Sequence, residues 1–177
     1  MTELFYFVHG TTCDNEKGLA SGQNDVPLSD KGINQAKNLK NLINKTNFDV
    51  IFCSDLLRAK QTAKIIFDGK DIIYDSRLRE CNYGNLNGKS NNLVDYSCHV
   101  NIPFPGGESL NDVLLRISDF LDFIKNNYCG KKIAIISHRA PQLAIMVKTK
   151  NITFNQAISS DWRRSGNWQP GWRYVLD

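Results

Sequence analysis

Two histidines stand at equivalent positions in this sequence, each just after a short apolar run. His9 follows the run 4–7, and His138 follows the run 133–136. Both runs are typical of buried strands in a parallel sheet. A polar side chain just beyond the carboxyl end of such a strand lies where α/β sheets bind ligands. The pair therefore predicts an active site in which one imidazole attacks a substrate and the other stabilises the charge that develops.

Other polar residues are expected at neighbouring strand ends and loops, and their types fit phosphoryl transfer. A neutral imidazole can attack phosphorus, and guanidinium groups such as Arg58 neutralise the phosphoryl oxygens. A carboxylic acid such as Glu80 can protonate the leaving alkoxide, and its carboxylate can then activate water. This chemistry requires no metal and no cofactor.

Strand-like and helix-like patterns alternate along the chain, which indicates α/β layering. The expected strands are residues 3–8, 49–53, 71–74, 131–137 and 171–176. The first expected helix is capped by Ser29 and carries one apolar face. That face comprises Ile33, Ala36, Leu39, Leu42 and Ile43. Residues 57–67 form a second helix, a third begins at Ser109, and a fourth begins near Pro141.

Composition places the chain among globular proteins and predicts one domain over residues 1–177. No apolar run approaches the roughly 20 residues that span a bilayer, and no signal-peptide pattern is present at residue 1, so we expect a cytoplasmic location. The five cysteines are odd in number and form no CxxC pair, which argues against a disulfide framework or a zinc site. Cys13 and Cys81 are expected near the site as free thiols.

The formal net charge of +4 favours a small anionic substrate. Basic residues are spread along the chain, and the pair Arg163 and Arg164 is expected on the solvated surface, so we expect neither a nucleic acid nor a membrane as a partner. The aromatic residues of the tail are expected to complete the core from a final strand. They are Trp162, Trp168, Trp172 and Tyr174. The remaining histidine, His99, is expected on an exposed loop.

An ordered series of short motifs gives the chain a family resemblance. The series comprises His9-Gly10, residues 25–29, Gly32 with Gln35-Ala36, residues 54–63, residues 78–80, residues 105–109 and Ser137-His138. With these motifs the chain resembles the histidine phosphatase superfamily, which has the phosphoglycerate mutase-like fold. The resemblance implies a three-layer α/β/α sandwich with a mostly parallel central sheet.

The resemblance also implies a role for each matching residue. His9 would be the phosphorylated nucleophile, and Glu80 would be the proton donor. Arg58 and His138 would bind the phosphoryl oxygens, with Asn15 assisting the phosphate pocket. Asp25 and Ser29 would shape a loop and cap its helix, while Gly106, Gly107 and Ser109 would serve a turn and a second cap.

One departure from the family pattern concerns phosphate binding. The family usually has arginine where Val8 stands here, and an unexpected arginine, Arg139, follows His138. We hypothesise that Arg139 extends from the neighbouring strand end and replaces the missing guanidinium. The alternative is that Arg139 points to solvent or pairs with a carboxylate. A second departure is Thr11, where the family usually has glutamate.

The leading functional prediction is a metal-independent phosphatase that hydrolyses a small phosphomonoester through a phosphohistidine. One alternative is phosphoglycerate mutase-type transfer. Related mutases are generally longer, with extra segments that hold the phosphoglycerate. Residues 89–104 are expected to form a loop, which either covers the site or is an ordinary surface connection. This short loop leaves little room for phosphoglycerate. Another alternative is a catalytically impaired, anion-binding or regulatory homologue, because Val8 replaces the usual arginine. Sugar phosphates, phosphorylated sugar acids, nucleotides, cofactor precursors and phosphoproteins all remain candidate substrates.

Overall fold

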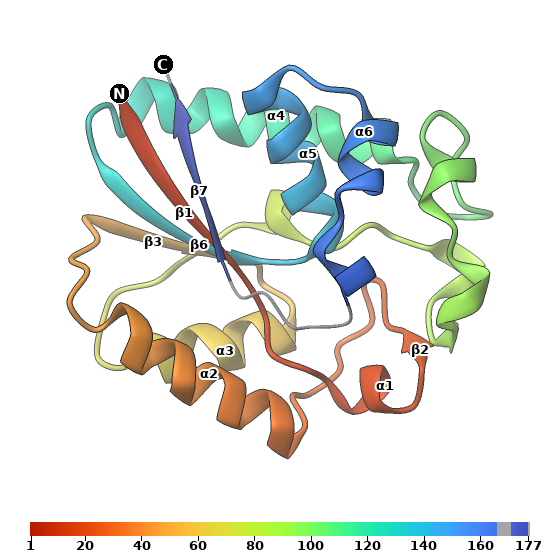
Figure 1. Cartoon of the computed structure of the whole chain (residues 1–177), viewed down its shortest axis with the longest axis horizontal. Helices are drawn as coiled ribbons and strands as arrows, with labels where there is room; N and C mark the ends of the chain where they lie inside the picture. The colour runs from red at the N-terminus through yellow and green to blue at the C-terminus, as the bar shows by residue number, and fades with distance from the viewer. Residues whose placement is uncertain (166–170, 177) are drawn as a thin grey trace.

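The computed structural model describes residues 1–165 and 171–176, which build a central sheet between two layers of helices (Figure 1). The strand order is β4-β3-β6-β1-β7. Strands β1, β3, β4 and β6 run parallel, and β7 lies antiparallel to β1 at one edge. Their bounds are Thr2–Val8 (β1), Val50–Cys53 (β3), Ile73–Tyr74 (β4), Lys132–Ser137 (β6) and Gly171–Leu176 (β7). The mostly parallel sheet expected from the sequence is confirmed.

Helices cover both faces of this sheet. Helices α2 (Asp30–Ile43) and α3 (Leu57–Ile66) lie below it in Figure 1. Helices α4 (Leu110–Asn127) and α5 (Arg139–Lys150) lie above it, with the short α6 (Phe154–Ser159) against α5. Both faces of β1 are therefore buried, which explains its continuous apolar run. Leu4, Tyr6 and Val8 join the core with α4 and α5, and Phe7 joins the core with α2 and α3.

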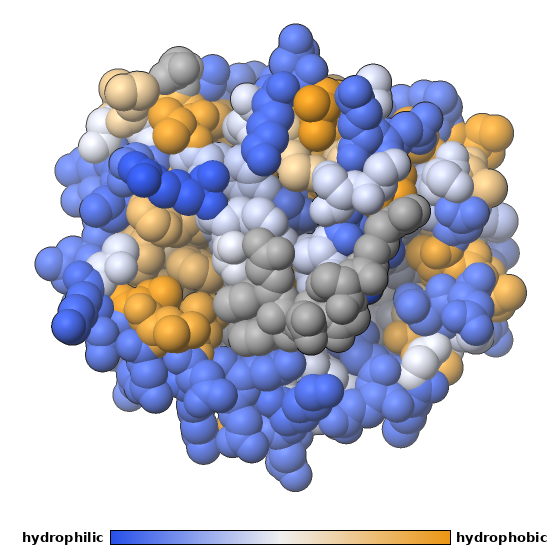
Figure 2. Space-filling model, in the orientation of Figure 1, coloured by the Kyte–Doolittle hydropathy of each residue, from blue (hydrophilic) through white to orange (hydrophobic). Residues whose placement is uncertain are grey.

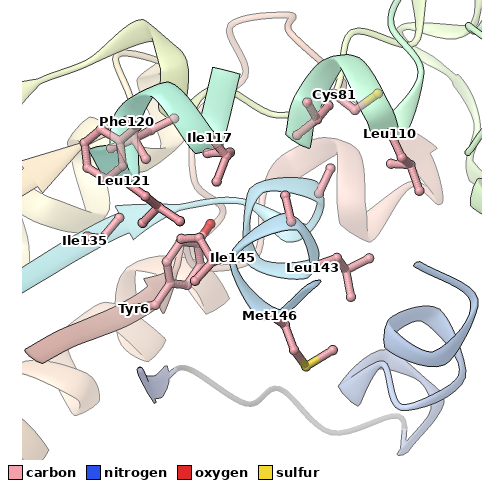
Figure 3. Close-up of a cluster of buried hydrophobic side chains, with 14 of the residues drawn as sticks. Tyr6, Cys81, Leu110, Ile117, Phe120, Leu121, Ile135, Leu143, Ile145 and Met146 are labelled. Atoms are coloured by element: carbon pink, nitrogen blue, oxygen red, sulfur yellow. The ribbon is translucent and has the colours of Figure 1, made fainter. Parts of the chain in front are cut away.

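The upper core is packed mainly by α4 and α5. Figure 3 shows Ile117, Phe120 and Leu121 of α4 close to Tyr6 of β1 and Ile135 of β6. All of these side chains are at most 1% exposed. Burying one such side chain contributes roughly 1.5–3 kcal/mol to folding, so this cluster anchors the two histidine-bearing strands in place.

Local sequence determines where the long helices begin. Ser29 caps α2 by accepting the Gly32 N–H, and Ser109 caps α4 in a capping box with Asp112. Pro141 lies in the first turn of α5, where a helix needs no N–H from it. These helix starts were all expected.

One prediction about the core is wrong, because Leu42 lies on the surface. Leu42 is 75% exposed, whereas Ala36 and Leu39 are buried. A helix turns by about 100° per residue, so Ala36, Leu39 and Ile43 point in similar directions around the axis of α2. Leu42 points roughly 100° away from the centre of this buried stripe. The apolar face of α2 is narrower than the spacing of its apolar residues suggested.

The structure also contains short elements that periodicity did not predict. They are α1 (Cys13–Glu16), β2 (Leu19–Ala20), β5 (Lys89–Ser90), η1 (Ser76–Leu78), η2 (Gly84–Leu86), η3 (Asn91–Leu93), η4 (Tyr96–His99), η5 (Trp162–Ser165) and α6. The segment 89–104, expected as a plain loop, holds three of them, and its β5 pairs with β2. The expected strand 71–74 is shortened to Ile73–Tyr74 at the sheet edge.

The visible surface is mainly hydrophilic. Figure 2 shows apolar residues in separate small groups among charged and polar ones. No helix within residues 1–165 and 171–176 combines the length and apolarity needed to cross a membrane.

Candidate active site

The sheet order brings the two strand-end histidines together. Strands β1 and β6 are parallel neighbours, and Val8 pairs in register with Ser137, so the next residues, His9 and His138, leave the same edge side by side. Their ring centroids lie 5.0 Å apart. The expected juxtaposition is therefore present in the structure.

The hydrogen bonds of His9 leave one ring nitrogen suited to attack. Its Nδ1 lies 2.7 Å from the carbonyl oxygen of Gly10. A carbonyl only accepts, so Nδ1 carries the proton and the neutral ring keeps its lone pair on Nε2. The turn beyond His9 is held by Thr62 of α3, whose Oγ1 accepts the Gly10 N–H. A Cβ at Gly32 would lie 2.0 Å from the Thr11 carbonyl oxygen, so glycine is required where α2 passes this turn.

Arg58 lies in the first turn of α3, and its guanidinium is fixed beside His9. The Nε–H donates to His9 Nε2 over 3.2 Å. The two Nη groups donate to the carbonyl oxygens of Asn24 and Gly22, and Arg58 as a whole is only 2% exposed. The Asp25 carboxylate accepts the N–H of Leu57 at the start of α3, as expected of a loop-shaping residue. Arg58 thus presents a buried positive charge at His9 Nε2.

His138 is fully buried and is held by contacts from two other strands. The hydroxyl of Tyr6 in β1 donates to the His138 carbonyl oxygen (2.6 Å) and accepts its N–H (3.0 Å). Its Nε2 lies 2.8 Å from the Oγ of Ser54, just after β3. A buried tyrosine hydroxyl needs partners, and here they fix the chain at the start of α5.

The carboxylate of Glu80 lies at the N-terminus of α5. Its Oε1 accepts the N–H groups of Cys81 and Ala140 (both 2.9 Å), and its Oε2 accepts that of Arg139 (3.2 Å). The first N–H groups of a helix have no partner inside it and favour a carboxylate. Glu80 is therefore held in one orientation, is 4% exposed and lines a small recess together with His9.

Two connected hollows open at these residues. An outer cavity of about 490 Å³ is lined by His9, Asn15, Lys31, Asn91, Arg139 and Arg163, among others. A small inner recess of about 20 Å³ is lined by His9, Asn15, Arg58, Glu80, Asn91 and Arg163, among others. Asn15 thus lies in both walls, while its Oδ1 accepts the Thr12 N–H. Asn91 shows that the segment 89–104 reaches over the site.

Arg139 lines the outer cavity, but its charge already has a partner. Its Nε donates to the carboxylate of Asp161, and its guanidinium lies 4.3 Å from the centre of the Tyr96 ring. The Asp161 side chain is 1% exposed. This ion pair matches the alternative interpretation of Arg139, in which it pairs with a carboxylate rather than with phosphate.

Both histidines are held in the neutral form. Burial lowers the pKa of His9 well below its usual value, and the charges of Arg58 and Arg163 lower it further. Burial likewise lowers the pKa of His138, followed by the charges of Arg58 and His9. A neutral His9 keeps the lone pair that nucleophilic attack needs.

These lowered pKa values predict that acid weakens the fold. Below about pH 6.5 the unfolded chain binds protons on both histidines while the folded chain does not, so the free energy of unfolding falls as pH falls. The slope is up to about 1.4 kcal/mol per pH unit for each histidine. Urea denaturation between about pH 7.5 and 5.5 measures it. We expect a shallower slope for His9→Asn, and an equal slope in that variant would contradict the assignment.

Among the other residues singled out from the sequence, Cys81 lies beside Glu80 and donates its backbone N–H to that carboxylate. His99 stacks on Phe104 with ring centroids 3.8 Å apart. All five cysteines are free, and burial, followed by the charge of Glu80, raises the pKa of Cys81, which keeps its thiol protonated. Trp172 and Tyr174 pack on the core from β7, as expected, while Trp168 lies outside the described residues. No three His, Cys, Asp or Glu side chains in the described part of the chain are grouped as a metal site.

A protein-family sequence model described as "Histidine phosphatase superfamily (branch 1)" matches residues 5–163 of the chain. The chain belongs to the histidine phosphatase superfamily. The family resemblance inferred from the motif series is therefore confirmed, and so is the phosphoglycerate mutase-like fold.

Several characterised members of this superfamily are similar to the chain. The "Fructose-2,6-bisphosphatase TIGAR" of Xenopus tropicalis is 37% identical over 130 residues, which are 66% of this chain and 47% of that protein. The chain spans about half the length of the TIGAR relatives that it matches. A "2,3-bisphosphoglycerate-dependent phosphoglycerate mutase" of Allorhizobium ampelinum is 30% identical over 172 residues, 85% of this chain and 81% of that protein.

A solved structure of the superfamily shares the architecture. Phosphoserine phosphatase from Entamoeba histolytica, in complex with 3-phosphoglyceric acid, superposes with a TM-score of 0.78 at 26% identity. The match covers 91% of this chain and 86% of that one.

Sequence reasoning missed two residues at this histidine phosphatase site. Tyr6 was expected only as a core residue, and its hydroxyl partner lies 132 residues away. Arg163 was expected on the surface, and it is exposed, yet it lines both hollows. A polar group inside an apolar run is a usable sequence indication for Tyr6; nothing local to Arg163 indicates its position.

Proposed function

We propose that the protein is a metal-independent phosphoric monoester hydrolase that acts on a small phosphorylated metabolite through a phosphohistidine at His9. The observation that carries this proposal is the Nε2 lone pair of a neutral His9, facing Arg58 and sharing the inner recess with Glu80. Nucleophile, cation and acid are the three groups that two-step phosphoryl transfer requires.

In the first step, His9 Nε2 forms a bond to phosphorus while the bond from phosphorus to the alkoxide oxygen breaks. Glu80, protonated, passes its proton to that oxygen. In the second step, the Glu80 carboxylate takes a proton from water, and the water oxygen attacks phosphorus as the N–P bond breaks. Inorganic phosphate leaves, and His9 and Glu80 return to their starting forms.

The phosphoryl oxygens are assigned to Arg58 and Asn15, which line the inner recess. The family resemblance adds His138, whose ring centroid lies 5.0 Å from that of His9 although it lines neither hollow. Arg58 already donates to His9 Nε2, so an entering phosphoryl group takes over that N–H as it reaches the nucleophile. Among the sequence candidates, Arg139 lines only the outer cavity, and its Nε is paired with Asp161. Its backbone N–H, which binds Glu80, is the clearer contribution to the site.

Hydrolysis is preferred to two alternatives. Mutase-type transfer is supported by a mutase among the relatives, and hydrolysis by relatives named as phosphatases. An impaired, anion-binding homologue is supported by Val8, which is 4% exposed and brings no charge to the site. Against it stands the complete set of His9, Arg58, Glu80 and His138, since anion binding alone requires neither a free nucleophile nor an acid.

The test is phosphate release from a panel of phosphomonoesters in the presence of EDTA. We expect inorganic phosphate and the dephosphorylated alcohol in equal amounts, because water is the acceptor. Phosphate passed to an added alcohol or phosphoglycerate, with none released, would indicate a mutase. Vanadate or phosphate binding that raises the melting temperature without any turnover would indicate an anion-binding protein.

A further inference from the structure

Basic side chains and no carboxylate are found among the described residues that line the outer cavity. Lys31, Arg139 and Arg163 approach it from three separate elements. Such a wall attracts and orients anions. The arginines are the ones able to present a planar fork to phosphoryl oxygens.

Of these three, only Arg163 also lines the inner recess. There it shares the wall with His9, Arg58 and Glu80. Its charge is near enough to act on both imidazoles: after burial and Arg58, it further lowers the pKa of His9, and it also contributes to the lowered pKa of His138. Arg163 therefore links the outer cavity to the recess that holds the proposed reacting groups.

The surroundings of the two arginines differ in a way that favours Arg163. The Asp161 carboxylate pairs with the Arg139 guanidinium through Oδ2 and accepts the backbone N–H of Arg163 through Oδ1. Arg139 and Asp161 thus position the η5 turn. The Arg163 guanidinium lies over the Trp162 ring at 5.4 Å and forms no ion pair within residues 1–165 and 171–176. Glu80, the carboxylate that lines the inner recess with Arg163, accepts backbone N–H groups from Cys81, Arg139 and Ala140.

The end of β1 supplies no charge of its own. Val8 is buried against the core and lines the outer cavity with an apolar side chain. The basic side chains that line the inner recess are then Arg58 of α3 and Arg163 of η5.

We propose that Arg163 is a second guanidinium that contacts the transferring phosphoryl group, in addition to Arg58. This assignment rests on the proposed function and adds a residue from the C-terminal part of the chain to it. In this arrangement Arg139 is a positioning residue, which acts through Asp161 on the turn that carries Arg163.

Kinetics and phosphate binding of Arg163→Ala test the assignment. We expect kcat to fall about 10²-fold, because one preorganised donor to the transition state is lost. We also expect the affinity for orthophosphate, measured by isothermal titration calorimetry, to fall about tenfold, since a charge-assisted hydrogen bond is lost. Arg163→Lys keeps the charge without the fork, so both values should lie between those of Arg163→Ala and the wild type.

Lys37→Ala is the matched control. Lys37 is exposed on α2 and lines neither hollow, so its removal changes net charge alone and should leave both values unchanged. Unchanged melting temperatures establish that each variant folds. Because Arg139 acts through Asp161, we expect Arg139→Ala to reduce kcat less than Arg163→Ala does.

Two results would overturn the assignment. One is kcat and orthophosphate affinity of Arg163→Ala within about twofold of wild type. The other is a raised KM with unchanged kcat and unchanged orthophosphate affinity, which would place Arg163 against the rest of the substrate. If the wild type releases no phosphate from any ester, the proposed function fails, while the orthophosphate titration still decides the role of Arg163.

Discussion

His9→Ala is expected to abolish phosphate release, with a loss on the order of 10⁴–10⁶-fold as for other enzymes that lose a nucleophile. The cavity offers no substitute. His138 is 0% exposed, lines neither hollow and has its Nε2 against Ser54, so it cannot take the place of His9 Nε2. Both the chemical step and the covalent intermediate should disappear together.

Labelling with radioactive phosphorus measures formation of the covalent intermediate. The wild type is mixed with a phosphomonoester carrying radioactive phosphorus and quenched in base, where an N–P bond survives. We expect label on the wild type and none on His9→Ala. His99→Ala is the matched control, since that imidazole stacks on Phe104 and lines neither hollow, and it should keep label and turnover. Label retained on the His9 variant would contradict the role assigned to His9.

Glu80→Gln is expected to reduce kcat by about 10²–10⁴-fold, and the loss should depend on the leaving group. An alkyl alkoxide needs a proton as it departs, whereas a nitrophenolate leaves without one. We therefore expect a large loss with alkyl phosphates and a much smaller loss of phosphorylation rate with p-nitrophenyl phosphate. Glutamine keeps one acceptor oxygen for the N–H groups of Cys81 and Ala140, so the fold should survive.

Burst kinetics with the two kinds of ester separate phosphorylation from hydrolysis of the intermediate. Glu108→Gln is the matched control: this carboxylate shares the partners Arg116 and Gln23 with the backbone of Glu80 but lines neither hollow. We expect it to leave the ratio of the two ester rates unchanged. An equal loss with both esters in Glu80→Gln would show that Glu80 is not the proton donor.

Features that depend on neighbouring residues could be predicted from the sequence. The apolar runs that form β1 and β6 and the capping residues Ser29 and Ser109 act through contacts within a few positions, so their patterns are visible along the chain. Leu42 shows the limit of this reasoning, because spacing cannot reveal how wide a stripe of α2 the sheet covers.

For the candidate site, too, the sequence indicates some features and the tertiary structure alone shows the others. The motif series placed His9, Arg58, Glu80 and His138 as candidates, and the strand order places His9 beside His138. The partners that orient them come from far along the chain. Glu80 accepts an N–H at the N-terminus of α5, 60 residues further along the chain. Arg139 pairs with Asp161, which lies just beyond α6. Such contacts leave no periodic trace in the sequence.

The sequence by itself determined the α/β layering, which follows from periodicity, and the family, which follows from the motif series. It also supplied the candidate reacting groups, because their residue types stand at strand ends. Only the tertiary structure decided which way the arginines point. The buried carboxylate of Asp161 requires a paired cation, and which arginine reaches it depends on how distant segments pack. Asp161 pairs with Arg139, and Arg163 of η5 lines both hollows, the inner one together with His9 and Arg58.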